Sequence, residues 1–98
     1  MKQETLTTIS ALFEKEAVYL NRTVTYDDLA LLSGENVNDL QSDFEKEFGY
    51  SLDEMISVWR LCHARELLLK GVPYSLVWKL SGFKSRKELE REWDKLIY

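Results

Sequence analysis

The sequence predicts an all-α protein in which two helix-turn-helix subdomains are joined by one long central helix. Three observations lead to this fold class. Apolar residues recur at helical spacing along the chain, no segment alternates between apolar and polar residues as a strand would, and one residue pattern occurs twice. Because 98 residues suffice for only one modest core, we expect a single domain over residues 1–98.

The first half is expected over about residues 9–49, as three helices separated by turns. Apolar residues at steps of three and four predict the first helix over 9–20. The second helix begins after Thr25, a predicted N-cap, and the third runs from the predicted cap Asn36 to Gly49. The apolar residues that define these helices are Ile9, Leu12, Phe13, Ala17, Leu20, Leu29, Ala30, Leu32, Leu40, Phe44 and Phe48.

A long linker helix is expected over about residues 51–70, where Ser51 has capping-box spacing to an acidic residue. The second half is expected over about residues 73–98. Its short helix follows Pro73, and its last helix begins at Ser85, again with capping-box spacing. The apolar residues of these helices are Leu52, Met55, Ile56, Trp59, Leu61, Ala64, Leu67, Leu68, Tyr74, Leu76, Val77, Leu80, Leu89, Trp93, Leu96 and Ile97.

The two halves repeat each other. Residues of the first short helix and its glycine turn return 48 positions later, and residues of the next helix return 49 positions later. A central helix of about 20 residues measures about 30 Å, close to the roughly 34 Å between successive major grooves of DNA, so the spacing suits duplex DNA. The matched pairs are Tyr26 and Tyr74, Leu29 and Val77, Leu32 and Leu80, Ser33 and Ser81, Gly34 and Gly82, Leu40 and Leu89, Phe44 and Trp93, and Lys46 and Lys95.

Composition excludes several classes of protein. A lone cysteine, Cys62, cannot form an internal disulfide, and no apolar stretch approaches the roughly 20 residues of a membrane span, so we expect a cytoplasmic protein with no membrane partner. Cys62 and His63 lack further ligands at metal spacing, and the chain has no catalytic motif or phosphate-binding loop. We therefore expect no metal, no cofactor and no catalytic residue, and the chain is not predicted to be an enzyme.

The central helix carries Arg60-Leu61, Ala64 and Leu67-Leu68, and in this spacing it resembles the DNA-binding domain of AraC-type transcription regulators. The resemblance covers nearly the whole chain. It implies homeodomain-like halves, sequence-specific binding of double-stranded DNA by a bacterial regulator, and a sensor or receiver domain elsewhere in a longer chain. Further matched residues are Leu29-Ala30, Leu40, Phe44, Phe48-Gly49, Gly82-Phe83, Ser85 and Arg91.

The resemblance also implies which residues contact DNA. In the first recognition helix it assigns base contacts to Asn38, Gln41 and Ser42, and the two amides are suited to adenine. In the second it assigns base contacts to Lys87 and Arg91, and arginine is suited to guanine. The residues assigned to phosphate are Lys46, Lys84, Ser85, Arg86 and Lys95.

The charge distribution makes the two halves unequal. The net charge is −4, and residues 35–48 carry five acidic side chains against one basic side chain. Because acidic groups repel phosphate, we expect the second half to lead in DNA binding. One alternative is that the basic residues of residues 84–91 form a solvated face paired with Glu88, Glu90 and Glu92. The other is a helix-turn-helix scaffold that has lost DNA affinity and docks a basic protein through its acidic half.

Overall fold

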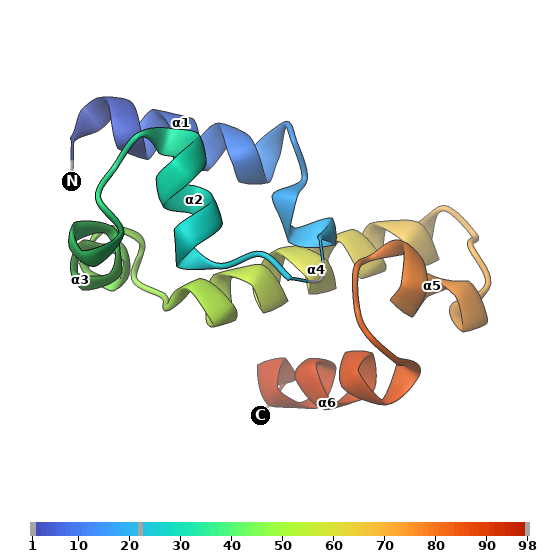
Figure 1. The fold of residues 1–98 in the computed structure, drawn as a ribbon. Helices are drawn as coiled ribbons and strands as arrows, with labels where there is room; N and C mark the ends of the chain where they lie inside the picture. The colour runs from blue at the N-terminus through green and yellow to red at the C-terminus, as the bar shows by residue number, and fades with distance from the viewer. Residues whose placement is uncertain (1, 22, 98) are drawn as a thin grey trace. The chain divides into compact units, whose positions relative to one another are not determined.

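The computed structural model describes residues 2–21 and 23–97, with side chains up to residue 95. The predicted all-α class is confirmed, because this part of the chain contains six α-helices and a 3-10 turn and no strand (Figure 1). The elements are α1 (Gln3–Glu14), η1 (Val18–Leu20), α2 (Tyr26–Ser33), α3 (Val37–Phe48), α4 (Leu52–Leu69), α5 (Tyr74–Leu80) and α6 (Arg86–Ile97).

The chain divides into two compact units. The first unit comprises residues 2–18 and 23–55, and the second comprises residues 19–21 and 56–97. Two of the three residues of η1, Tyr19 and Leu20, therefore belong to the second unit although they lie between α1 and α2 in the sequence. None of the helices in the described ranges has both the length and the hydropathy needed to cross a bilayer.

In the first unit, α2 packs against both α1 and α3. The Tyr26 ring meets the Phe44 ring edge-on, with the ring centroids 5.6 Å apart, and the Tyr26 hydroxyl oxygen accepts a 3.2 Å hydrogen bond from the Leu52 amide. Tyr26 thus ties the start of α2 to both α3 and the start of α4. The buried residues of this unit are Thr5, Ile9, Phe13, Val24, Leu29, Ala30, Leu40, Phe44, Leu52 and Met55.

Two of the predicted helix starts are confirmed by side-chain caps. The Thr25 hydroxyl accepts from the Asp28 amide at 3.3 Å, while the Asp28 carboxylate accepts from the Thr25 amide at 2.9 Å. Ser51 and Glu54 form the same reciprocal pair, at 3.2 Å in each direction. These bonds satisfy amides that the first turn of a helix leaves without backbone partners, which is why the sequence located both helices correctly.

The predicted bounds of the first helix, residues 9–20, are wrong at both ends, because α1 already begins at Gln3. Helix α1 ends at Glu14, and the chain then passes through Ala17 at a φ of +50° into η1. The guanidinium of Arg60 explains this ending, because its Nε donates to the Tyr19 carbonyl at 2.6 Å and its Nη2 donates to the Asn21 carbonyl at 3.0 Å. Continuing the helix would turn these carbonyls away from Arg60, so a contact with α4 overrides the apolar periodicity.

The second unit is built around a cluster to which α4, α5 and α6 all contribute. Gly82, in the turn between α5 and α6, has a φ of +90°, and a Cβ atom there would lie 2.9 Å from the Tyr19 carbonyl oxygen. Only glycine allows the turn to approach η1 this closely. The buried residues of this cluster are Leu61, Ala64, Val77, Phe83 and Leu89. The partly buried residues packed against it are Leu67, Val72, Trp78 and Trp93.

The helix bounds repeat with the offsets found in the sequence. Helices α2 and α5 begin 48 positions apart, and α3 and α6 each have 12 residues and begin 49 positions apart. The turns also correspond, because the Glu35 amide donates to the Ala30 carbonyl at 3.2 Å and the Phe83 amide donates to the Trp78 carbonyl at 2.9 Å. Trp78, which stands where the first half has Ala30, is half-buried against the cluster of the second unit.

Candidate nucleic-acid interface

Ser85 caps the start of α6. Its hydroxyl oxygen accepts from the Glu88 amide at 3.1 Å, whereas the Glu88 carboxylate accepts from the Lys84 amide at 3.3 Å. In a reciprocal capping box the Glu88 carboxylate would accept from the Ser85 amide, but here it accepts from the Lys84 amide, one residue earlier. The Ser85 hydroxyl, to which the resemblance assigns a phosphate contact, already serves this cap.

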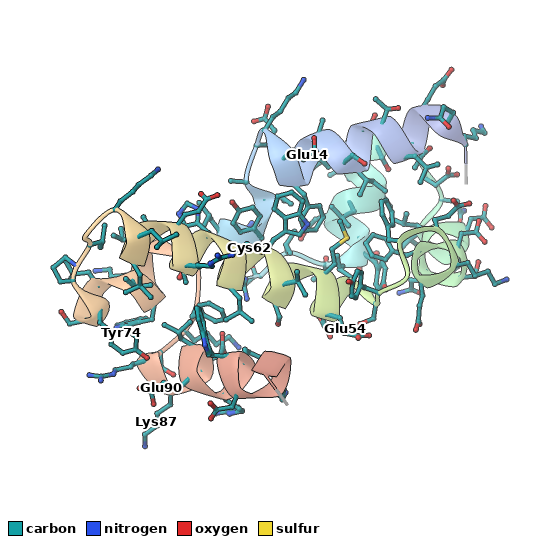
Figure 2. All side chains as sticks on the ribbon, turned by 180° about the vertical axis from the view of Figure 1, so that it is seen from behind. Glu14, Glu54, Cys62, Tyr74, Lys87 and Glu90 are labelled. Carbon is teal, nitrogen blue, oxygen red and sulfur yellow. The ribbon has the colours of Figure 1, made fainter. Side chains whose placement is uncertain are left out.

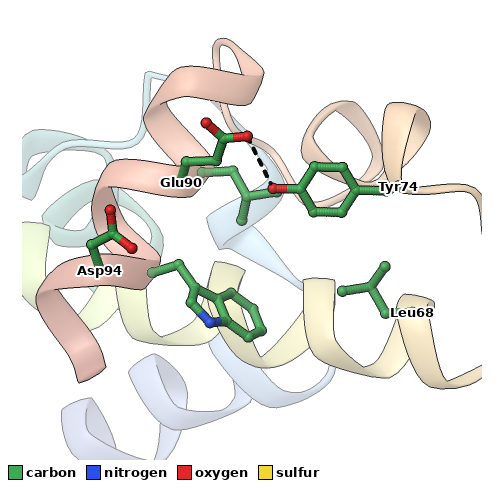
Figure 3. Close-up of a pocket in the computed structure, with 6 residues that line it drawn as sticks. Leu68, Tyr74, Glu90 and Asp94 are labelled. Carbon is green, nitrogen blue, oxygen red and sulfur yellow. Dashed lines mark hydrogen bonds between the residues drawn. The ribbon is translucent and has the colours of Figure 1, made fainter.

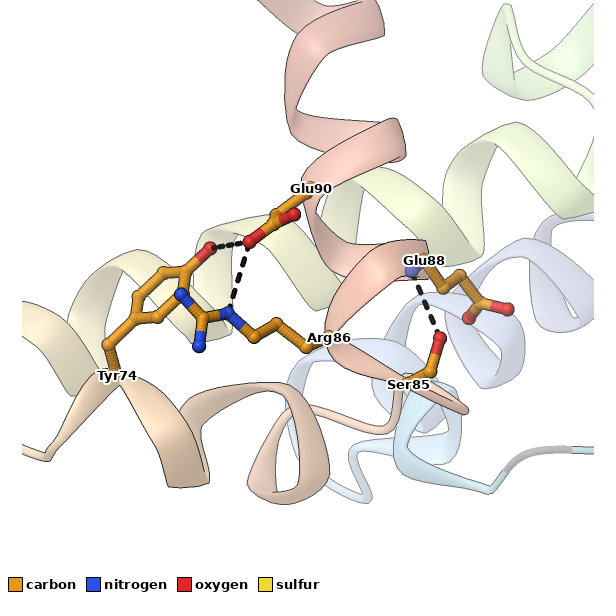
Figure 4. A network of polar contacts seen from close by, with 5 residues as sticks. All are labelled: Tyr74, Ser85, Arg86, Glu88 and Glu90. Atoms are coloured by element: carbon orange, nitrogen blue, oxygen red, sulfur yellow. Dashed lines mark hydrogen bonds and ion pairs between the residues drawn. The ribbon is translucent and has the colours of Figure 1, made fainter.

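Arg86 is held by a network that spans α5 and α6 (Figure 4). Its Nε donates to the Glu90 carboxylate at 3.1 Å, and its guanidinium carbon lies 4.7 Å from the centroid of the Tyr74 ring. The Tyr74 hydroxyl donates to the same carboxylate oxygen of Glu90 at 3.3 Å. The Arg86 charge is thus partly balanced within the protein, although 59% of its side chain remains exposed.

The sequence offered Glu90, together with Glu88 and Glu92, as an alternative partner of the basic residues 84–91, but it did not identify Tyr74. Glu90 stands four positions after Arg86, a spacing that places two side chains together on a helix, so this pair was detectable as one of several alternatives. Tyr74 lies on a different helix, and no sequence signal pointed to its contact with Arg86. Lys95 is also engaged, because its ammonium lies 3.2 Å from the Glu92 carboxylate.

Three cations remain exposed at the start and along one face of α6. Lys87 and Arg91 stand four residues apart on α6, which places their side chains on one face of the helix, and Lys84 lies just before the helix begins. None of them takes part in an ion pair among the side chains that the structure describes. Figure 2 shows the Lys87 side chain extending away from the α6 ribbon. We call these three residues the basic stripe.

Helix α3 presents different chemistry at the corresponding positions. Asn38 and Gln41 are exposed, and the Ser42 hydroxyl donates to the Asp39 carbonyl at 3.0 Å within the helix. Lys46 is exposed near the end of the helix. The remaining exposed ionisable side chains of α3 are acidic: Asp39, Glu45 and Glu47.

A second polar group lies around Tyr19, away from the predicted site residues. The Tyr19 ring stacks on Trp59 with centroids 5.7 Å apart, and its hydroxyl oxygen lies 3.5 Å from Nδ1 of His63. Burial raises the pKa of the Tyr19 phenol, and the nearby Glu66 and Cys62 raise it further. The phenol therefore stays protonated at neutral pH. Within the described part of the chain, no three His, Cys, Asp or Glu residues are grouped as a metal site would require.

Comparisons of the chain with protein-family models, with curated proteins and with solved structures gave no significant match. The resemblance to AraC-type regulators therefore rests on the residues and spacings of this chain alone.

Proposed function

We propose that this chain is the DNA-binding part of a bacterial transcription regulator of AraC type, with α2–α3 and α5–α6 as its two helix-turn-helix pairs. In this proposal α3 and α6 are the recognition helices. The observation that carries it is the basic stripe, Lys84, Lys87 and Arg91, which is exposed and has no ion-pair partner among the described side chains. Unpaired cations at the start of a helix and along it are suited to a polyanion, because binding releases counterions from the phosphates.

Each member of the basic stripe has a separate role in this proposal. Lys84 precedes the first turn of α6, where an ammonium and the nearby helix amides both favour phosphate. Arg91 lies near the middle of the helix, and its guanidinium is able to donate two hydrogen bonds to O6 and N7 of guanine. Lys87 lies one turn before Arg91 and reaches the next base or its phosphate.

The α3 helix would contribute less. Asn38 and Gln41 carry amides that pair with adenine, and both side chains are exposed. The exposed carboxylates of Asp39 and Glu45 on the same helix repel phosphate. We therefore propose that α6 supplies most of the affinity and that α3 adds discrimination at positions read by its amides.

Titration of duplex DNA into the protein at low and at moderate salt tests this proposal. We expect affinity to fall steeply as salt rises. Arg91→Ala should cost about 1–3 kcal/mol and relax the preference at one base pair, whereas Lys84→Ala should weaken all sequences alike. Lys15→Ala is the matched control, because it removes an exposed lysine that follows α1 and lies outside α6. Unchanged binding in both α6 variants, or equal losses in all three, would contradict the proposal.

A second function is favoured by the surface of the first unit. The α2 helix exposes 83% of Leu31 and 57% of Leu32, and it packs against the acidic helix α3. Exposed apolar side chains beside carboxylates suit a protein partner that is apolar and basic. In this alternative the two-helix pairs form a docking scaffold. It predicts no DNA complex even at low salt, and that result would favour docking over DNA recognition.

A further inference from the structure

The second unit contains a hollow of about 200 Å³ on the side of α6 that faces α4 and α5 (Figure 3). Its wall combines apolar and aromatic side chains with two carboxylates. The basic stripe does not use it, because Lys84, Lys87 and Arg91 are absent from its lining. The residues that line it are Leu68 from α4, Tyr74 from α5, and Leu89, Glu90, Trp93 and Asp94 from α6.

One wall of this hollow already holds a cation. The Arg86 guanidinium stacks on the Tyr74 ring and pairs with Glu90, at the distances given above. A ring face and a carboxylate together attract a cation through the ring quadrupole and through the opposite charge. Arg86 therefore demonstrates the binding chemistry of this wall and also balances the Glu90 charge.

The other carboxylate has no such partner. Asp94 lines the hollow one turn after Glu90, and no ion pair or hydrogen bond joins it to any side chain that the structure describes. Trp93, the neighbouring residue on α6, also lines the hollow and is partly buried. Tryptophan is the aromatic side chain that attracts cations most strongly. The hollow thus presents one uncompensated negative charge beside an indole and an apolar floor.

We propose that this hollow binds a small organic cation, namely a primary ammonium group attached to an aliphatic or aromatic body. The ammonium pairs with the Asp94 carboxylate, and the apolar body lies against Trp93 and Leu68. A volume of about 200 Å³ equals that of about seven water molecules in the liquid, at roughly 30 Å³ each, and so suits a body about the size of one aromatic ring. A ligand with a single positive charge is preferred, because the Glu90 carboxylate is already paired with Arg86.

Phenethylammonium is the probe for this site, because it combines one ammonium with an aromatic body of suitable size. Its binding is followed by two-dimensional NMR, with the Trp93 indole N–H identified as the signal that disappears in Trp93→Phe. We expect a saturable shift of this signal, with a Kd of about 0.1–1 mM because the carboxylate is exposed. The neutral analogue 2-phenylethanol should bind more weakly, and phenylacetate should not bind.

Asp94→Asn and Glu92→Gln separate a specific contact from a change in net charge. Both variants remove one carboxylate from α6, but only Asp94 lines the hollow. We expect Asp94→Asn to weaken phenethylammonium binding about fivefold and Glu92→Gln to leave it unchanged. The unperturbed spectrum of each free variant checks that it folds. Nα-acetyl-lysine amide is the second ligand to be tested. If it binds as tightly as phenethylammonium, the natural source of the cation is a lysine side chain of a protein.

The inference is overturned if neither ligand produces a saturable shift of the Trp93 signal up to about 10 mM. It is also overturned if 2-phenylethanol binds as tightly as phenethylammonium, or if the two variants lose affinity equally. These measurements contain no DNA, so they are independent of the proposed recognition of DNA by α6.

Discussion

Helices α3 and α6 are equivalent in the repeat but carry different surfaces. Each has 12 residues, and each buries a leucine at the same position, Leu40 in α3 and Leu89 in α6. Their exposed positions differ: Ser42 of α3 corresponds to Arg91 of α6. The buried residue is the same in both helices, whereas the charge at this exposed position differs. The scaffold and the surface chemistry are therefore separable in this protein.

The two turns that precede these helices differ in a similar way. Gly34 and Gly82 both have positive φ angles, of 74° and 90°. No atom lies within 4 Å of a Cβ built on Gly34, whereas a Cβ on Gly82 would meet Tyr19, Leu20 and Arg60. The first turn needs glycine for its backbone angle alone. The second turn needs glycine for its angle and for its contact with η1.

The largest effect is expected from a matched pair of glycine substitutions. Gly82→Ala should lower the free energy of unfolding by about 3 kcal/mol, because it adds a backbone clash to the strain of a left-handed residue. Gly34→Ala should cost only about 1 kcal/mol, from the backbone strain. Urea unfolding followed by circular dichroism measures both values. Equal losses would mean that the contact between the second turn and η1 does not stabilise the fold.

An arginine placed in α3 at the position equivalent to Arg91 tests whether the surface of α3 can bind DNA as that of α6 is proposed to do. Ser42→Arg should raise duplex DNA affinity about threefold to tenfold and steepen the salt dependence by about one phosphate contact, because it adds a cation at the position equivalent to Arg91. DNA titration at several salt concentrations measures both changes. Ser42→Ala is the control and should leave affinity unchanged. If Ser42→Arg has no effect, the acidic helix does not lie near DNA in the complex.

The caps of the two helices should differ by a smaller amount. The Asn36 side chain accepts from the amides of Asn38 and Asp39, whereas the Ser85 hydroxyl accepts from the Glu88 amide alone. We expect Asn36→Ala to cost about 1–2 kcal/mol and Ser85→Ala about 0.5–1 kcal/mol in the free energy of unfolding. A larger loss for Ser85→Ala in denaturant titrations would refute this ranking.

The serines at the end of α2 and directly after α5 should also differ in their effect on stability. The Ser33 hydroxyl oxygen is buried with no hydrogen-bond partner in the described structure, while the Ser81 hydroxyl donates to the Val77 carbonyl. Ser33→Ala should therefore be neutral or stabilise by about 0.5 kcal/mol, and Ser81→Ala should cost about 1 kcal/mol. Thermal and urea unfolding of the two variants test the difference. Destabilisation by Ser33→Ala would show that its hydroxyl has a partner in solution.

Several features of the candidate site followed from local sequence, and others did not. The start of α6 at Ser85 was predicted, because a cap and its helix are neighbours in the chain. The exposure of Lys87 and Arg91 also followed from their place opposite Leu89 on the helix. The restraint of Arg86 by Tyr74 did not follow, since it depends on how α5 packs against α6.

The helices, their caps and the repeat of 48 and 49 positions were determined by the sequence, because capping bonds and apolar periodicity act over a few neighbouring residues. Tertiary structure decided where α1 ends and why Gly82 is required. Both depend on Arg60 and η1, which are joined by a hydrogen bond between residues 41 positions apart. The hollow beside Asp94 likewise exists only because α4, α5 and α6 come together. Contacts between residues so distant in the chain leave no repeating pattern among neighbouring residues, so they cannot be predicted from local sequence.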